Sequence, residues 1–98
     1  MEPIFSPQAS GILDELEKDA ANNRLVGAIW DVIDLITQHP GSNQARRRAL
    51  RSAKGHSIWL VPIPGHYDDE AGVVLWQPRD DNALIAYIGP EDFRSADI

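Results

Sequence analysis

The sequence contains no cysteine, so disulfides, thiolate zinc sites and a cysteine nucleophile are excluded. It has no apolar run of the roughly 20 residues that a membrane-spanning helix needs. Its N-terminus shows no basic segment followed by an apolar stretch, the pattern of a secretory signal. Glycine-rich phosphate loops, nucleophile elbows and paired-carboxylate motifs are also absent. We therefore expect a cytoplasmic protein without membrane contact, metal or cofactor.

The length of the chain limits its organisation. Its 98 residues can form one hydrophobic core but are too few for two. No linker or internal repeat divides them, and the hydrophobic fraction of 43% is that of a folded chain. A single domain over residues 1–98 follows.

The net charge of −6 is unevenly distributed. Residues 1–40 carry seven acids and two bases, and residues 56–98 carry eight acids and two bases. Residues 41–55 carry five bases and no acid. Because phosphate binding needs a local excess of cations, a polyanion would have to bind at this basic island, whose members are Arg46, Arg47, Arg48, Arg51 and Lys54.

Two amphipathic helices are expected in the acidic first part. Ser6-Pro7 is an N-cap followed by proline at the first helical position, and Asn22-Asn23 marks a break before a second helix. The second helix should end before Pro40, and its apolar residues recur at helical spacing, Leu25, Ile29, Val32, Ile33 and Ile36. A short helical turn is expected over residues 44–50.

After Gly55 the pattern predicts three short strands, at residues 57–61, 73–76 and 84–88. The turn at 79–82 favours an antiparallel hairpin between the last two. Since two helices cover only one face of a sheet, the second apolar face would meet a partner protein or close over a groove. The alternative is that the chain's own side chains and C-terminal tail cover it.

Four short motifs follow one another along the chain. Phe5-Ser6-Pro7-Gln8-Ala9 begins the first helix, and His39-Pro40-Gly41-Ser42 ends the second. A passage from Leu50 to Val61 leads into the sheet, and a passage from Val73 to Gly89 makes the last hairpin. In these motifs and their order the chain resembles the RelE/ParE superfamily over about residues 4–92. The resemblance implies an α+β fold, with an N-terminal helical pair packed on a small antiparallel sheet.

The resemblance also implies a function, that of the toxin in a type II toxin–antitoxin pair. A cognate antitoxin protein wraps and neutralises such toxins, and the chain would then form a hetero-oligomer with it or a homodimer. RelE-like members arrest growth by cutting messenger RNA on the ribosome with the 2′-hydroxyl as nucleophile. ParE-like members act on a protein target, DNA gyrase.

The chain departs from the ribonuclease pattern at three places. Those enzymes carry an arginine in the strand that aligns with Val73–Trp76, and this chain has none there. Their WRLRV passage reads Trp59-Leu60-Val61-Pro62-Ile63 here, without either arginine. Pro90-Glu91-Asp92 stands where they place tyrosine, histidine or lysine, and carboxylates repel a phosphate. Two hypotheses stay open: a metal-independent endoribonuclease, or a non-catalytic binding module acting on a protein or as a complex component.

Under the ribonuclease hypothesis, residues of the basic island and its neighbours would carry out the reaction. Phosphate transfer needs cations against the phosphate and a group that moves protons. Arg48, Arg51 and Lys54 would hold the phosphate, His56 would carry the proton, and Arg79 would add a supporting cation.

Further contacts to RNA or to an acidic antitoxin are assigned to the rest of the island and two aromatic residues. Arg46, Arg47 and Arg48 would bind either partner; the alternative is a solvated helix end paired with the chain's own carboxylates. Trp59 and Tyr87 are candidate contacts, although core packing is the other interpretation of each. With Trp30 and Trp76, Trp59 is expected to form the core.

Overall fold

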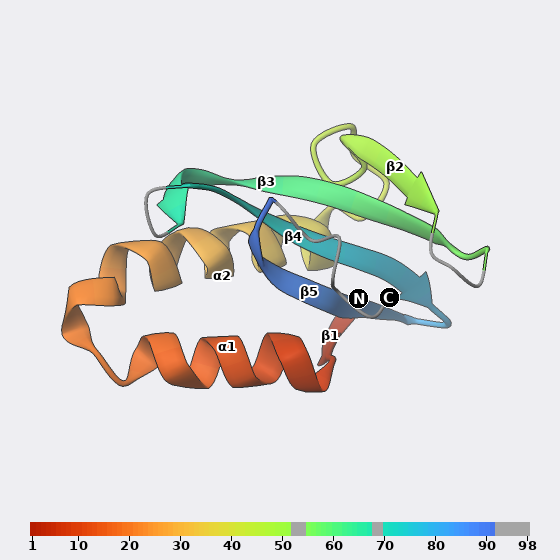
Figure 1. Cartoon of the computed structure of the whole chain (residues 1–98). Helices are drawn as coiled ribbons and strands as arrows, with labels where there is room; N and C mark the ends of the chain where they lie inside the picture. The colour runs from red at the N-terminus through yellow and green to blue at the C-terminus, as the bar shows by residue number, and fades with distance from the viewer. Residues whose placement is uncertain (52–54, 68–69, 92–98) are drawn as a thin grey trace.

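The computed structural model of the chain describes residues 1–51, 55–67 and 70–91. Its five strands form one sheet in the order β1-β5-β4-β3-β2, and both α-helices lie against one face of it (Figure 1). This is the predicted α+β architecture, and it matches the RelE/ParE-like arrangement. In chain order the elements are β1 (Glu2–Phe5), α1 (Pro7–Glu17), the short 3-10 helix η1 (Ala20–Asn22), α2 (Asn23–Gln38), β2 (Arg48–Arg51), β3 (Ser57–Tyr67), β4 (Glu70–Arg79) and β5 (Asn82–Pro90).

The helix boundaries are those that the local sequence predicts. The Ser6 hydroxyl accepts a hydrogen bond from the Ala9 backbone N–H at 3.1 Å, and Pro7 occupies the first turn, where its missing N–H leaves no bond unmade. α2 ends at Gln38, since the following His39 precedes Pro40 and leaves the helical conformation. No helix in the described ranges is long and apolar enough to cross a membrane.

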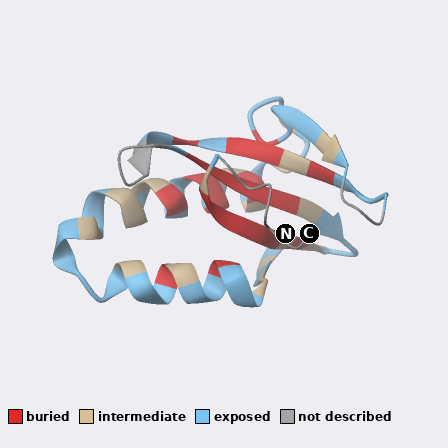
Figure 2. Ribbon diagram, viewed as in Figure 1, coloured by how far each residue is buried: buried red, intermediate tan, exposed pale blue. Residues whose placement is uncertain are grey.

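The helix-covered face of the sheet holds the main hydrophobic core. The buried residues of α2 are the apolar stripe expected from the sequence, Ile29, Val32, Ile33 and Ile36. Ala9 and Leu13 of α1 join them, and the strands contribute alternate side chains, as the two-residue repeat of β-structure requires. Figure 2 shows that burial is concentrated in the central strands and on the helix sides turned toward them.

The second face of the sheet carries a smaller cluster, made of Ile58, Leu60, Val73, Leu75 and Tyr87, with Leu50 packed against it. The five cluster residues are 0–8% exposed, so they form a second, smaller core on this face. That this face meets a partner protein or closes over a groove stays a prediction. The alternative, cover by the chain's own side chains and C-terminal tail, involves residues 92–98, which lie outside the described residues.

Two short edge strands complete the sheet beyond the three that the sequence predicts. β1 runs parallel to β5, from Glu2 opposite Asn82 to Phe5 opposite Ile85. β2 runs antiparallel to β3, from Arg48 opposite Leu60. The helical turn expected over residues 44–50 is wrong, because residues 43–46 form a turn and residues 48–51 form β2. Pairing with β3 overrides the helical preference of arginine, alanine and leucine.

The three tryptophans differ in burial, so the prediction that all three form the core is only partly right. Trp76 is fully buried and Trp59 is half-buried against the main core. Trp30 is 37% exposed, which corrects the prediction for that residue. Its ring meets Phe5 edge-on at 5.9 Å, and its indole N–H donates to Glu17 at 3.4 Å. Trp30 therefore links α2 to β1 and α1 at the rim of the core.

Candidate functional site

The connection between α2 and β2 is fixed to the sheet by a buried hydrogen bond. The Trp76 indole N–H donates to the Ala45 carbonyl at 2.7 Å, and Ala45 itself is fully buried. The Ser42 hydroxyl tightens the turn, because it donates to the His39 carbonyl and accepts from the Ala45 N–H. The first arginines of the basic island are therefore held in defined positions.

Arg46 packs over two tryptophan rings. Its guanidinium carbon lies 5.1 Å from the ring centroid of Trp59 and 5.9 Å from that of Trp76, within the range of a cation–π contact. Its Nε also donates to the Pro40 carbonyl at 2.7 Å. Arg46 thus covers the face of Trp59 that a nucleic-acid base would need for stacking.

Arg48 and Arg51 lie on opposite faces of the sheet. Leu50 packs on the second face, and alternation along β2 places Arg48 on that face and Arg51 on the helix-covered face. Arg48 approaches Glu91, with 3.7 Å between Nη1 and Oε1 and both side chains more than half exposed. Such an exposed pair contributes little to stability.

His56 and Arg79 lie at the end of the sheet where β3 begins and β4 ends (Figure 1). His56 directly precedes β3, and Arg79 is the last residue of β4. Both are exposed. Val73 and Leu75 of β4 are buried on the second face. The same alternation along β4 places Arg79 on that face, whereas Arg51 lies on the helix-covered face. Lys54 lies outside the described residues.

Tyr87 is packed within the second face. It is 8% exposed, and its hydroxyl donates to the Pro90 carbonyl at 2.9 Å. The ring crosses Gly89, where an added Cβ would lie 2.7 Å from the Tyr87 hydroxyl oxygen. This close approach explains the glycine and favours core packing as the role of Tyr87.

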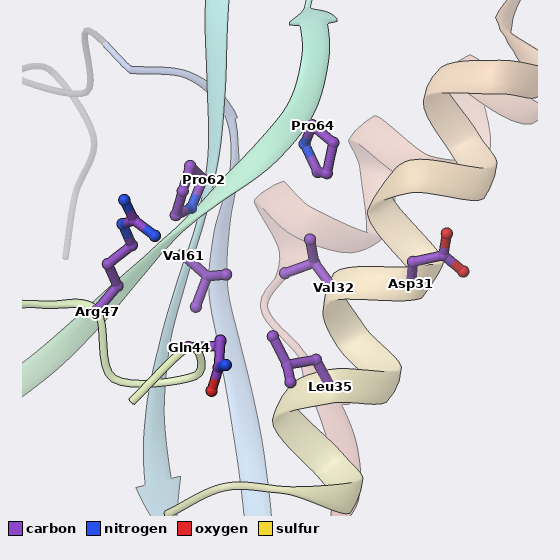
Figure 3. Close-up of a pocket in the computed structure, with 8 residues that line it drawn as sticks. All are labelled: Asp31, Val32, Leu35, Gln44, Arg47, Val61, Pro62 and Pro64. Carbon is purple, nitrogen blue, oxygen red and sulfur yellow. The ribbon is translucent and has the colours of Figure 1, made fainter. Parts of the chain in front are cut away.

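A groove of about 340 Å³ lies between α2 and β3 (Figure 3). Val32 and Leu35 project from α2 toward Val61 of β3 and form an aliphatic floor. We call this the α2–β3 groove; its rim is lined by Asp31, Gln44, Arg47, Pro62 and Pro64.

A second hollow of about 420 Å³ adjoins the groove. It is lined by Asn43, Gln44, Arg46 and Arg47, and the two spaces share Gln44 and Arg47. We call this the amide–arginine hollow. The aliphatic floor therefore lies next to two amides and two guanidinium groups. Together these groups can bind an apolar side chain beside a carboxylate.

The sequence alone does not indicate this arrangement. Val32 and Val61 have the spacing of ordinary core residues, and Gln44 and Arg47 belong to the segment predicted as a helical turn. The available signal is Pro62-x-Pro64 within an otherwise apolar strand, because proline in a sheet marks an edge.

Within the part of the chain that the structure describes, no three histidine or acidic side chains are grouped so that they could hold a metal ion. The described residues contain no buried side-chain nitrogen or oxygen without a hydrogen-bond partner. No protein-family model, no curated protein and no solved structure matches this chain.

Proposed function

We propose that this chain is the toxin-like component of a type II toxin–antitoxin pair and acts by binding a protein rather than by cutting RNA. The fold supports the first part of this proposal, because two N-terminal helices on a mostly antiparallel sheet form the RelE/ParE-like architecture. A cognate antitoxin is the partner that such an architecture implies.

One observation supports the choice of binding over catalysis: the described cations of the predicted ribonuclease site are divided between the two faces of the sheet. Arg51 lies on the helix-covered face, whereas Arg48 and Arg79 lie on the second face. Cleavage by a 2′-hydroxyl needs the proton carrier and the phosphate-binding cations around one scissile phosphate. Residues on opposite sides of a sheet do not meet that requirement.

The local charges favour the same choice. Arg46 is engaged by Trp59, Trp76 and the Pro40 carbonyl, and Arg48 is paired with Glu91. Of the four arginines in the basic island, two therefore contact other residues of the chain, Arg48 only through this long, exposed pair. The net charge of −6 adds a general repulsion of polyanions.

The proposal is tested by induced expression of the chain in a bacterial host, alone and together with the protein encoded by the adjacent gene. We expect growth to stop on induction of the chain alone and to resume when the neighbouring protein is co-expressed. A triple variant, Arg51→Ala with His56→Ala and Arg79→Ala, should arrest growth as the unmodified chain does.

Two results would contradict the proposal. Continued growth during accumulation of the folded unmodified chain would remove the toxin assignment. Loss of arrest in the triple variant, with unchanged circular dichroism and abundance, would return the function to the predicted catalytic residues.

A further inference from the structure

We propose that the α2–β3 groove and the amide–arginine hollow together bind an acidic, leucine-rich peptide segment of a partner protein. In this arrangement an aliphatic side chain of the peptide lies on the floor of the groove, and a neighbouring carboxylate binds Arg47. The inference rests on the proposed function, because it names the chemistry of the segment that a protein partner would present.

The floor determines the apolar part of the ligand. Val32, Leu35 and Val61 are all branched aliphatic residues, and they converge from two elements on one space (Figure 3). A volume of about 340 Å³ is at the lower end of ligand sites, which span roughly 300 to 1,000 Å³. The space therefore suits one or two aliphatic side chains of a peptide rather than a folded surface.

The adjoining hollow determines the charge of the ligand. Arg47 is exposed and forms no ion pair with any described residue, so its planar guanidinium is available to a carboxylate in two-pronged geometry. Asn43 and Gln44 beside it carry amides that can both donate to and accept from a peptide backbone. Positive charge and amide groups on one side of an aliphatic floor match an acid next to a leucine.

The exposed edge of β3 excludes binding by strand addition at this place. β2 covers β3 only as far as Leu60, and beyond that point Pro62 and Pro64 line the groove. Proline has no backbone N–H and cannot donate a hydrogen bond to an incoming strand. The peptide is therefore held by its side chains and by single backbone contacts with Asn43 and Gln44, not as an added strand.

A nucleic acid fits the same surface poorly. Bases bind without sequence preference by stacking on exposed aromatic rings, but Trp59 is covered by Arg46 and Trp76 is fully buried. Asp31 stands on the rim of the groove and would repel a continuous line of phosphates. A peptide with a single carboxylate near Arg47 avoids that repulsion.

The test is a titration of the ¹⁵N-labelled full chain, followed by two-dimensional NMR. The first probe is a synthetic acidic peptide of about 12 residues composed of glutamate and leucine. The comparison probes have equal length: one replaces leucine by serine, one replaces glutamate by lysine, and one is an oligouridine RNA. We expect the glutamate–leucine peptide to shift the amide signals of Gln44, Arg47 and Val61, and the other three probes to leave them in place.

Two charge-reversed variants complete the experiment. Arg47→Glu should weaken the affinity for the glutamate–leucine peptide by about tenfold or more, because an ion pair becomes a repulsion. Arg24→Glu makes the same charge change at an exposed position in the first turn of α2 and should leave the affinity unchanged. Since both sites are exposed, both variants should fold, which their unperturbed spectra would show.

The inference is overturned by equal binding of the serine peptide, by shifts elsewhere in the chain, by no binding at a peptide concentration of about 1 mM, or by RNA shifting the same signals. The proposed function is tested separately, by growth arrest in cells and by whether that arrest depends on Arg51, His56 and Arg79. Loss of the groove assignment would leave that result intact.

Discussion

The two edges of the sheet are closed by opposite chemical means. On the β5 edge, β1 pairs only as far as Ile85, and polar side chains from the start of α1 continue the closure. The Ser6 hydroxyl donates to the Ala86 carbonyl at 2.8 Å. The Gln8 amide donates to the Ile88 carbonyl at 2.8 Å and accepts from the Ile88 N–H at 3.0 Å, as a neighbouring strand would.

On the β3 edge, β2 pairs only as far as Leu60. There the chain removes backbone donors instead of satisfying them, through Pro62 and Pro64. Protection of sheet edges by proline is one of the general ways in which proteins avoid edge-to-edge association. The β5 edge is therefore closed by hydrogen bonds within the fold, whereas the β3 edge lies beside the α2–β3 groove, for which we propose a peptide ligand.

The largest effect on stability is expected from Gln8→Ala. The substitution removes both hydrogen bonds to Ile88, a fully buried residue, and should lower the free energy of unfolding by about 2 kcal/mol. Urea denaturation followed by tryptophan fluorescence measures the change. The matched control is Gln38→Ala, at the exposed last residue of α2, where we expect little effect; equal losses at both positions would show that Gln8 does not close the edge.

A smaller effect is expected at Arg46, whose packing fixes the segment before β2. Arg46→Gln removes the contact with Trp59 and the hydrogen bond to Pro40 and should cost about 1 kcal/mol. Arg47→Gln is the matched control, because this neighbouring side chain lines the groove without packing on a ring. Thermal unfolding of the two variants side by side should separate them, and equal midpoints would contradict the structural role of Arg46.

The smallest effect on stability should come from Pro62→Val, which restores a backbone N–H on the β3 edge. We expect the free energy of unfolding to change by less than about 0.5 kcal/mol, while self-association rises because a donor becomes available to a second chain. Sedimentation velocity at increasing concentration measures this association. Pro78→Val serves as the control, since it makes the same exchange near the hairpin end of β4, an internal strand of the sheet; identical sedimentation of the two variants would show that Pro62 does not protect the edge.

The sequence predicts those elements whose signals are local. Ser6-Pro7 and His39-Pro40 set helix boundaries within a few residues of themselves, and the structure confirms both. The turn between β4 and β5 is also predicted, and Asp80 adopts φ 54° there, a left-handed conformation that aspartate tolerates better than most residues.

Elements that depend on distant partners are not predictable in this way. β2 consists of Arg-Ala-Leu-Arg, residues that favour a helix in isolation, and its extended form depends on pairing with β3. β1 pairs with the other end of the chain. Trp30 is the opposite case, a residue predicted in the core that is exposed. The apolar residues of α2 extend around more of the helix than the sheet covers, so Trp30 stays at the rim.

The candidate site shows the same limit at the level of single residues. Arg46 and Arg47 are adjacent and chemically identical, so the sequence gives no reason to assign one to packing and the other to binding. Their difference depends on the positions of Trp59 and Val61, which the sheet register determines. The basic island is visible in the sequence, but its division between two faces is not.

Mapping RNA 5′ ends across the transcriptome of cells arrested by the chain decides between protein binding and RNA cleavage. We predict no new 5′ ends during the arrest, and the same profile for the variant that lacks Arg51, His56 and Arg79. New ends that appear with the unmodified chain and vanish in that variant would contradict the account.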